Sequence, residues 1–399
     1  MNILIVSTTD ILGGAAKVAW EIKRSCTERG DTVSMFVADK RSSDPTVHII
    51  PRPYWRKVLG FLLASEDLLA SDWILSTLEY KNADIIHCHN IHGRYFNLRT
   101  LEKMTKEKPV IWTLHDEWAI TPHCAYTLEG TAMKNGLYVC PSISTPPRLL
   151  WDNSARLSRA RTRLYERIKI HVVTPSIWLK KRAEQTALKQ QSIHHIPNGI
   201  DTKSFVQTDR TEARKKLNLP LDKKIILFLA TAGKANTWKG WVYTEAVLRH
   251  FRDQEDILFL NVGNLQPENP EPGVEYRAHV NDPAELALYY SAADVLLFTS
   301  IAENFPLVIL EAMSCGLPIV AFDVGGVAEV LEHKKHGYVG TYLNVPNLIE
   351  GLSWVFGRTP SEIRELSAQS SAKIAAQYDT KHMVTAYQNL YQKITSHHE

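Results

Sequence analysis

Short runs of Val, Ile and Leu alternate with helical patterns along this chain, and this alternation restricts the possible folds more than any other feature. Nearly continuous apolar runs are typical of strands buried on both faces, as in parallel sheets. Strands separated by helices indicate βαβ units. The expected strands are Ile3–Ser7, Val33–Val37, Asp84–Cys88, Val110–Leu114, His171–Thr174, Ile225–Ala230, Ile257–Val262, Val295–Thr299 and Ile319–Phe322.

These units form two series within 399 residues, a length that exceeds what one hydrophobic core usually serves. A turn cluster at Ile196–Asp201 separates the series. We therefore expect an α/β protein with two doubly wound domains, residues 1–195 and 196–379. The last segment, 362–394, has helical spacing and is followed by no strand.

The charge of the chain is small overall but unevenly distributed. Hydrophobic residues make up 44% and charged residues 22%, as in an ordinary globular protein, and the formal net charge is +3. Residues 148–189 hold eleven Lys and Arg against three acids, a surplus of +8 that leaves −5 for the rest. The overall charge gives no reason to expect a nucleic acid partner. The basic segment is either a solvated helix face or a contact for an anionic acceptor or a membrane surface.

Cysteine usage favours a reducing compartment. The cysteines are scattered, odd in number and without a Cys-x-x-Cys pair, so we expect a cytoplasmic protein rather than a disulfide framework. His123, Cys124 and Cys140 lack the usual spacing of a zinc site, and we expect no metal there. The first residues resemble a strand rather than a signal peptide, and no apolar run reaches the roughly 18 residues of a membrane span. The five cysteines are Cys26, Cys88, Cys124, Cys140 and Cys315.

A basic entry followed by apolar residues at helical spacing predicts an amphipathic helix within residues 52–69. One interpretation is a surface helix packed on the first domain. The other is an interfacial helix that would hold the protein peripherally at the inner face of a membrane. The apolar positions are Trp55, Val58, Leu59, Leu62, Leu63 and Leu69.

Two carboxylates eight positions apart identify the second half as the place to look for chemistry. Glu303 follows an expected strand, at the end where open α/β sheets bind ligands, and could accept hydrogen bonds from sugar hydroxyls. Glu311 lies about two turns into the next expected helix, among apolar residues. A partly buried carboxylate needs a polar partner, and a ribose diol would serve. A Glu311 that faces solvent is the alternative.

A second set of candidates also follows expected strands. Lys234 and Lys239 lie in a glycine-flanked loop, where two fixed cations suit a diphosphate; solvated surface lysines are the alternative. His115 could donate to a ligand oxygen or be an ordinary loop histidine. Gly13 and Gly14 precede a helical pattern and either let the backbone approach a ligand or form a tight turn. Their spacing is not that of the dinucleotide fingerprint, which disfavours a dehydrogenase.

Together these motifs resemble those of the family 4 retaining glycosyltransferases, from residue 1 to about 345. The specific part is the Glu-x7-Glu element of Glu303–Glu311 with Ala312–Pro318 after it; Asn198–Asp201, Asp323–Gly326 and Glu329 also match. The resemblance implies the GT-B fold, with two facing Rossmann-like domains and an interdomain cleft. The N-terminal domain would bind the acceptor and the C-terminal domain a UDP- or GDP-sugar. A terminal helix, about 380–399, would pack back onto the first domain.

The resemblance also implies roles for the candidates. The two lysines would grip the diphosphate, Glu311 would bind the ribose, and Glu303 would contact the donor sugar near the reacting carbon. The expected catalytic residues are Glu303, His115 and Lys239. The expected donor-binding residues are Gly13, Gly14, Lys234, Lys239, Glu303, Asn304, Phe305, Leu307, Val308 and Glu311.

The implied reaction is a hexosyl transfer with retention of configuration, without metal or cofactor, to a glycan or lipid-linked acceptor of a bacterial-type surface polysaccharide. Lys234 stands where the family commonly has Arg, and Asn304 and Pro306 replace two glycines. Because Pro306 has no N–H to donate, donor choice is expected to differ from that of the relatives. The alternatives are a nucleotide-sugar epimerase or hydrolase on the same fold, or a protein that binds the nucleotide sugar without turnover.

Overall fold

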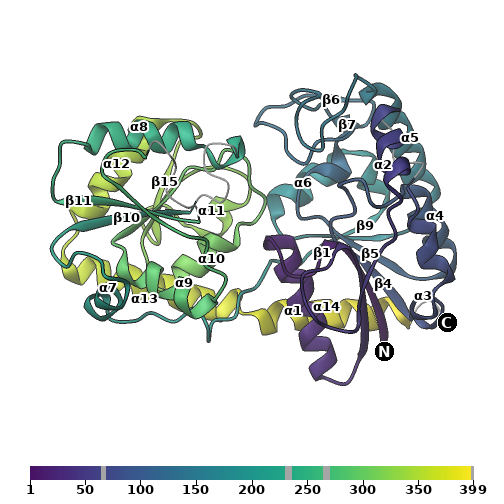
Figure 1. The fold of residues 1–399 in the computed structure, drawn as a ribbon, viewed down its shortest axis with the longest axis horizontal. Helices are drawn as coiled ribbons and strands as arrows, with labels where there is room; N and C mark the ends of the chain where they lie inside the picture. The colour runs from purple at the N-terminus through teal and green to yellow at the C-terminus, as the bar shows by residue number, and fades with distance from the viewer. Residues whose placement is uncertain (64–68, 230–235, 264–269, 397–399) are drawn as a thin grey trace. The chain divides into compact units, whose positions relative to one another are not determined.

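A computed structural model describes residues 1–63, 69–229, 236–263 and 270–396 (Figure 1). The chain divides into two compact units. Unit 1 comprises Met1–Asn198 together with the chain from Met383 onward, and unit 2 is Gly199–His382. Each unit contains a parallel sheet with helices against it, which is the doubly wound architecture expected from the alternating pattern.

The sheet of unit 1 has seven strands in the order β3-β2-β1-β4-β5-β8-β9, and all neighbouring pairs are parallel. Its central strands are buried because they carry the apolar runs of the sequence. A short antiparallel hairpin, β6 with β7, lies outside this sheet. The strands are β1 Asn2–Thr9, β2 Thr32–Asp39, β3 Val47–Ile49, β4 Ile85–Cys88, β5 Val110–Thr113, β6 Met133–Lys134, β7 Leu137–Tyr138, β8 His171–Thr174 and β9 Ser192–His195.

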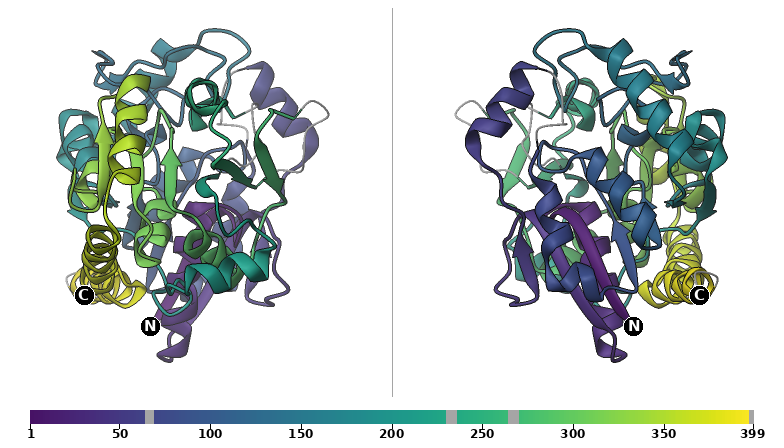
Figure 2. Two further views of the ribbon diagram at one scale, coloured as in Figure 1. Left: turned by 90° about the vertical axis from the view of Figure 1, so that its left-hand side faces the viewer. Right: turned by 90° about the vertical axis from the view of Figure 1, so that its right-hand side faces the viewer.

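The C-terminal helix α14 is part of unit 1 over most of its length. Figures 1 and 2 show it beside α1, and the Gln388 amide donates to Cys26 Sγ across this contact at 3.7 Å. The helices are α1 Gly14–Glu28, α2 Tyr54–Leu62, α3 Leu78–Asn82, α4 Leu98–Glu107, α5 Ser154–Arg167, α6 Ile177–Gln185 and α14 Thr380–Thr395, with 3₁₀ turns η1 Ser71–Ser76, η2 Trp118–Ile120 and η3 Ala187–Gln190.

The sheet of unit 2 has six parallel strands in the order β12-β11-β10-β13-β14-β15. Figure 1 shows α8 and α12 on one side of this sheet and α7, α9 and α13 on the other. The strands are β10 Lys224–Leu229, β11 Ile257–Val262, β12 Val274–Arg277, β13 Val295–Phe298, β14 Ile319–Phe322 and β15 Gly337–Gly340. The helices are α7 Arg210–Leu217, α8 Trp241–Phe251, α9 Pro283–Ala292, α10 Leu307–Ser314, α11 Val327–Val330, α12 Val345–Phe356 and α13 Pro360–Gln377, with the 3₁₀ turn η5 Thr237–Lys239.

The sequence pattern predicts the inner strands and misses the outer ones. All nine expected strands are present to within a residue or two, although Ala230 lies outside the described residues. Within the two parallel sheets, the strands without a prediction are the edges, β3, β9, β12 and β15. The short β6–β7 hairpin was also not expected. An edge strand has a neighbour on one side only and can carry polar residues, so β9 (Ser192–His195) and β12 (Val274–Arg277) have no continuous apolar run.

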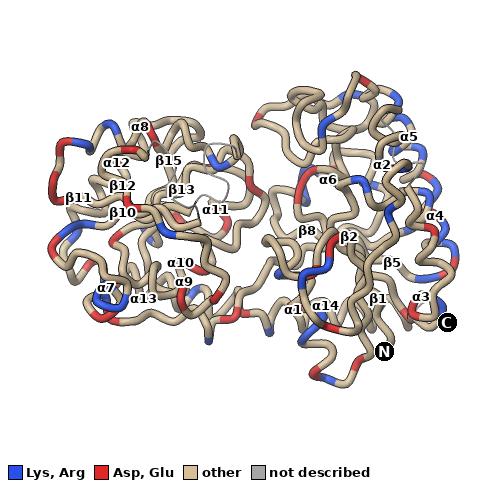
Figure 3. The backbone as a smooth tube through the Cα atoms, in the orientation of Figure 1, with Lys and Arg blue, Asp and Glu red and all other residues tan. Residues whose placement is uncertain are grey.

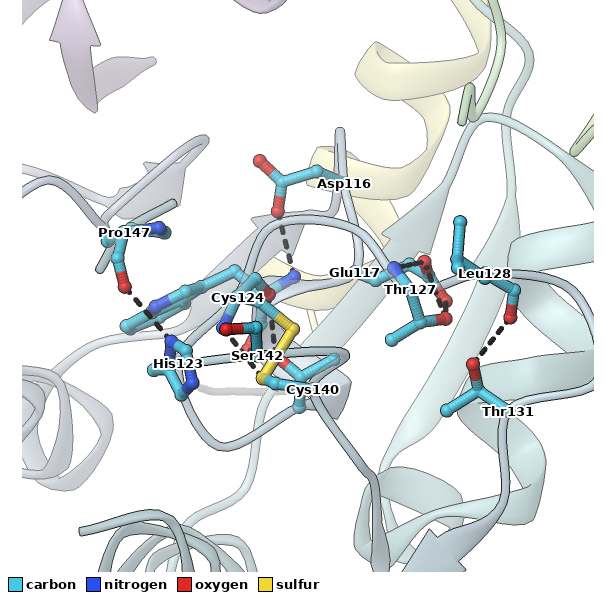
Figure 4. Close-up of a disulfide and its surroundings, with 12 residues drawn as sticks. Asp116, Glu117, His123, Cys124, Thr127, Leu128, Thr131, Cys140, Ser142 and Pro147 are labelled. Atoms are coloured by element: carbon cyan, nitrogen blue, oxygen red, sulfur yellow. Dashed lines mark hydrogen bonds between the residues drawn. A yellow bond between two sulfur atoms is a disulfide. The ribbon is translucent and has the colours of Figure 1, made fainter. Parts of the chain in front are cut away.

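The expectation that the cysteines remain unpaired is wrong for two of them. Cys124 and Cys140, both in the segment that connects η2 to α5, form a disulfide with their Cα atoms 5.8 Å apart (Figure 4). The other three cysteines are free and buried. No spacing motif marks this pair, because the two side chains meet only once the intervening residues, which include the β6–β7 hairpin, have folded.

The amphipathic segment is shorter than its sequence pattern. Helix α2 ends at Leu62, and residues 64–68 lie outside the described part of the chain. Tyr54 and Trp55 are 79% and 61% exposed, whereas Leu69 is buried. In the described part of the chain, none of the helices combines the length and the hydrophobicity that a membrane span requires.

Candidate active site

The strand order of unit 2 reverses between β10 and β13, and the candidate residues of the second half lie beyond these two strands. The chain leaves β10 toward β11 on one side and leaves β13 toward β14 on the other. A crevice forms at the carboxyl ends of the strands where such connections diverge, and open α/β sheets bind ligands there. Lys239 lies in η5 after β10, and Glu303 lies in the loop after β13.

Lys239 and Glu303 meet at this switch point. The Lys239 Nζ donates to Glu303 Oε1 at 2.6 Å, and the side chains are 33% and 10% exposed. The lysine therefore remains open to a ligand while the carboxylate is largely enclosed. A diphosphate bound here would contact Lys239, which already pairs with Glu303. The lysine would then lie between the phosphates and a carboxylate that can accept hydrogen bonds from sugar hydroxyls. Lys234, the other expected phosphate contact, lies outside the described residues.

Two glycines shape the loops that carry this pair. Gly240 follows Lys239 with a φ of +66°, and a Cβ there would collide with the carbonyl oxygen of Thr299. Gly325 has a φ of +58°, and a Cβ there would collide with the carbonyl oxygen of Glu303. The glycine pair of the Asp323–Gly326 element thus supports the Glu303 loop by close backbone packing. Its neighbour Gly326 donates its N–H to the Asn304 carbonyl at 2.8 Å.

Glu311 lies closer to the start of its helix than the sequence indicates. The expected position was about two turns into the helix, but α10 begins at Leu307, so Glu311 is little more than one turn inside. Its side chain is 3% exposed, and Oε2 accepts the hydroxyl of buried Tyr290 at 2.8 Å. Burial is the main cause that raises the pKa of Tyr290, and the neighbouring Glu311 raises it further. The solvent-facing alternative for Glu311 is therefore excluded, and Tyr290 is a partner that sequence reasoning missed.

Helix α10 begins beyond the carboxyl end of β13, so its first backbone N–H groups belong to the same end of the sheet as Glu303. Asn304 and Phe305 are buried in the loop before the helix, and Leu307 and Val308 are its first two residues. The first N–H groups of a helix have no partner within it, and the helix dipole makes this end favourable for anions. Pro306 is the N-cap residue, where a missing N–H interrupts no helical bond.

The N-terminal candidates belong to unit 1 and follow its own inner strands. Gly13 and Gly14 come after β1, and Gly13, with a φ of +90°, is the N-cap of α1. The loop before them is fixed by Asp10, whose carboxylate is fully buried. This carboxylate accepts hydrogen bonds from the backbone N–H groups of Ile11, Arg41 and Ser42. Hydrogen bonds from Ser42 and Arg41 outweigh burial and lower the pKa of Asp10. Asp10 was not predicted, although an acid directly after a strand end could have indicated it.

His115 follows β5 and belongs to a group of histidines. Its Nε2 lies 2.8 Å from His89 Nδ1, and the two rings are stacked. Burial is the main cause that lowers the pKa of His115 to about 4, so the ring is neutral at pH 7. His92 pairs with Asp116 at 2.6 Å. His89 was not predicted, although the His-x-His spacing of His87 and His89 at the end of β4 could have indicated it.

The structure thus assembles the candidates in two groups. Lys239, Glu303, Asn304, Phe305, Leu307, Val308 and Glu311 gather around the switch point of unit 2. Gly13, Gly14 and His115 lie beyond β1 and β5 of unit 1, on either side of β4. Among the described residues, no cluster of three or more His, Cys, Asp or Glu side chains is arranged to hold a metal ion.

Two doubly wound units are the architecture of the GT-B fold, which solved structures similar to this chain share. In a comparison with solved structures, the chain matches a sucrose-phosphate synthase from Thermosynechococcus elongatus with a TM-score of 0.71 and 18% identity, over 99% of both chains. It also matches HepE from Anabaena in complex with UDP-glucose, with a TM-score of 0.68 and 17% identity over 98% of this chain and 99% of that one. At these identities the likeness concerns the fold.

Sequence comparisons identify the family. The glycosyl transferases group 1 profile matches residues 209–365, and the glycosyltransferase family 4 profile matches residues 12–204. The putative colanic acid biosynthesis glycosyl transferase WcaC of Escherichia coli K12 is 25% identical over 98% of this chain and its own full length. A D-inositol 3-phosphate glycosyltransferase of Mycolicibacterium smegmatis is 25% identical over 71% of this chain and 64% of that protein. The chain belongs to the family 4 glycosyltransferases and is an enzyme of the transferase class.

Proposed function

We propose that this enzyme transfers a hexose from a nucleotide-diphosphate sugar, with retention of configuration, to a glycan or lipid-linked acceptor of a surface polysaccharide. The observation that carries the proposal is the Lys239–Glu303 pair at the switch point of unit 2, next to the start of α10. The relatives support it: HepE is described in complex with UDP-glucose, and WcaC is assigned to colanic acid biosynthesis.

The donor would be bound by unit 2 through groups of complementary chemistry. Lys239 and the first N–H groups of α10 would neutralise the diphosphate. Glu303 would accept hydrogen bonds from the hydroxyls of the sugar. Glu311 has one oxygen bonded to Tyr290, and its carboxylate would accept the ribose hydroxyls.

Catalysis would consist mainly of stabilising the charge of the leaving nucleotide. As the bond between the sugar carbon and the phosphate oxygen breaks, negative charge develops on the diphosphate, and Lys239 would compensate that charge. Its ion pair with Glu303 at the switch point supports this role. We propose a front-face reaction in which the leaving phosphate takes the proton of the acceptor hydroxyl. Neutral His115 would contribute hydrogen bonding rather than charge.

The proposal is tested by following labelled sugar from UDP- and GDP-hexoses into an acceptor fraction. Label in a glycan product with the anomeric configuration of the donor is the expected result. Free labelled hexose, or an epimerised nucleotide sugar, would contradict a transferase that acts on these donors. The same assay with EDTA tests metal independence: activity is expected to persist, and a loss that Mg²⁺ or Mn²⁺ restores would contradict it.

We further propose a peripheral membrane position in the cytoplasm for the enzyme. The exposed apolar side chains of α2, including Tyr54 and Trp55, provide an amphipathic surface. Lys and Arg gather along α4 and α5 of the same unit, which suits anionic head groups (Figure 3). Co-sedimentation with vesicles that contain anionic lipid, compared with neutral vesicles, tests this position.

A further inference from the structure

A small cavity in unit 1 has a lining that suits an anion. Its volume is about 40 Å³, and a single water needs roughly 10–15 Å³. The C-terminal end of α2, the loop after β4, the loop before α5 and α5 itself form its walls. None of the residues assigned above to the donor or to catalysis lines it.

The charged side chains in this lining are all cationic. Arg94, Arg148 and Arg161 line the cavity, and no described residue of the lining is acidic. The guanidinium carbons of Arg94 and Arg148 lie 4.1 and 5.9 Å from the ring centre of Phe61 in α2. Three guanidinium groups around one small space repel each other unless an anion lies among them.

The position of Arg161 is fixed by the protein itself. Its guanidinium donates to the carbonyl oxygens of Trp118 and Thr121 and lies 3.9 Å from the centre of the Trp118 ring. The side chain is 4% exposed and its charge is held at the wall of the cavity. Because the side chain is already ordered, binding of a ligand would cost little further conformational entropy. Arg94 is tied to the same region by a hydrogen bond from Nη2 to the Arg148 carbonyl at 2.6 Å.

A buried histidine nitrogen without a partner provides an independent observation. His123 lines the cavity and is 4% exposed. Its Nδ1 must donate to the Pro147 carbonyl at 3.0 Å, because a carbonyl oxygen only accepts (Figure 4). Its Nε2 is buried and has no hydrogen-bond partner among the described residues. A buried polar atom without a partner is costly, and a ligand would remove that cost.

The protonation state of His123 fits a phosphate. Burial and then Arg161 lower the pKa of the ring, while the Pro147 carbonyl and Asp152 oppose the shift. Asp152 does not line the cavity and accepts the Ser154 N–H. In the neutral ring Nε2 accepts, so it could take the O–H of a monoprotonated phosphate while the arginines bind the charged oxygens.

We propose that this cavity binds a phosphate group of the acceptor. The inference rests on the proposed function for its biological role, but not for the binding chemistry. The wall formed by α2 also indicates what is attached to the phosphate. Leu62 and Leu63, next to Phe61, are 49% and 47% exposed, and Trp151 donates its Nε1–H to the Leu62 carbonyl. An acceptor with its phosphate in the cavity could lay an alkyl chain on this surface.

Calorimetry of the full chain, with UDP added to occupy the proposed donor site, tests the assignment. Inorganic pyrophosphate is expected to bind. Arg148→Gln is expected to lower the affinity for pyrophosphate about tenfold, because a charge-assisted contact is lost. Arg148 is exposed, so this change leaves the core intact. Arg159→Gln is the matched control: it removes the same charge from an exposed position on α5 outside the cavity, and should change affinity less than twofold.

Two further probes identify the source of the phosphate. Farnesyl diphosphate that binds more tightly than pyrophosphate, with farnesol weaker than both, would indicate a lipid-linked phosphate; equal affinities of the two phosphates would indicate a free one. An equal loss in Arg148→Gln and Arg159→Gln, or no binding of pyrophosphate, would overturn the site. UDP affinity is measured on the same variants and should not change, so a failure of the phosphate site is separable from a failure of the donor site.

Discussion

At the scale of single residues, the two acidic positions of the Glu-x7-Glu element have different surroundings. Glu303 forms an ion pair with a partly exposed lysine, whereas Glu311 is buried against a tyrosine hydroxyl. A carboxylate beside a cation at a crevice is suited to contact a reacting sugar. A buried carboxylate with one oxygen already bonded is suited to hold a fixed part of the ligand, such as the ribose.

The ribose role of Glu311 predicts a selective loss of nucleotide binding. Glu311→Gln keeps the size of the side chain and removes its charge, so UDP affinity should fall about tenfold, because hydrogen bonds to charged groups contribute about 1.5–3 kcal/mol. Calorimetry measures the change. Glu285→Gln removes the same charge from an exposed site on α9 and should leave affinity unchanged. Equal UDP affinity of Glu311→Gln and the unmodified enzyme would reject the role.

The contact of Gly325 with the Glu303 backbone predicts a steric effect. Gly325→Ala combines a positive φ with a collision and should both destabilise unit 2 and weaken UDP binding. Gly273→Ala is a matched control, since Gly273 also has a positive φ, +77°, but nothing lies within 4 Å of its Cβ position. That control should cost only the left-handed backbone penalty, about 1–2 kcal/mol. If urea unfolding gives the same loss of stability for Gly325→Ala and Gly273→Ala, the contact with Glu303 is unimportant.

At the scale of elements, α14 is held to unit 1 by a buried polar chain. The Tyr391 hydroxyl lies 2.7 Å from His87 Nδ1, His87 Nε2 lies 2.8 Å from the Thr113 hydroxyl, and that hydroxyl lies 3.0 Å from the Tyr387 hydroxyl. All four side chains are buried. The last helix of the chain therefore satisfies polar groups on β4 and β5, which the sequence pattern of these strands alone did not indicate.

Breaking this chain is expected to weaken the docking of α14. Tyr391→Phe removes a hydroxyl and leaves His87 Nδ1 buried without its partner, at a cost of about 1–3 kcal/mol in the free energy of unfolding. Tyr54→Phe makes the same chemical change at a position that is 79% exposed and should cost almost nothing. Urea titration compares the variants. A similar small effect in both would mean that the buried chain does not stabilise the helix.

Edge strands mark the limit of prediction at this scale. The inner strands are recognisable because both faces are covered and each position must be apolar. Strands β12 and β15 pair on one side only, and their sequences, Val274–Arg277 and Gly337–Gly340, lack that requirement. The sheet neighbour, and not the local sequence, makes them strands.

At the scale of the whole molecule, several buried histidines couple stability to pH. Burial, with a smaller contribution from His115, lowers the pKa of His87 to about 3. The pKa of His115 is lowered to about 4, and so is that of His336, again chiefly by burial. In the unfolded chain these groups titrate near 6.5, so the unfolded state takes up protons first as the pH falls.

Stability is therefore expected to be complete above about pH 6.5 and to decline toward pH 4. A single buried histidine contributes up to about 1.4 kcal/mol per pH unit in this range. Urea unfolding at pH 7.5, 6 and 5 measures the slope. His87→Gln should reduce this slope, whatever the substitution costs in free energy of unfolding at pH 7.5. His279→Gln, at an exposed position, should leave the slope unchanged. A slope that His87→Gln leaves unchanged would contradict a neutral, buried His87.

The sequence by itself determined the two doubly wound units, their inner strands, and the placing of Lys239, Glu303 and Glu311 at strand ends or just beyond. These features follow from local periodicity and motif spacing, which a linear chain carries. The tertiary structure alone decided the edge strands, the Tyr290 partner of Glu311, the contact of Gly325 with Glu303, and the Cys124–Cys140 disulfide. Each of these depends on side chains or backbone that are distant in sequence and meet only after packing, so no local pattern records them.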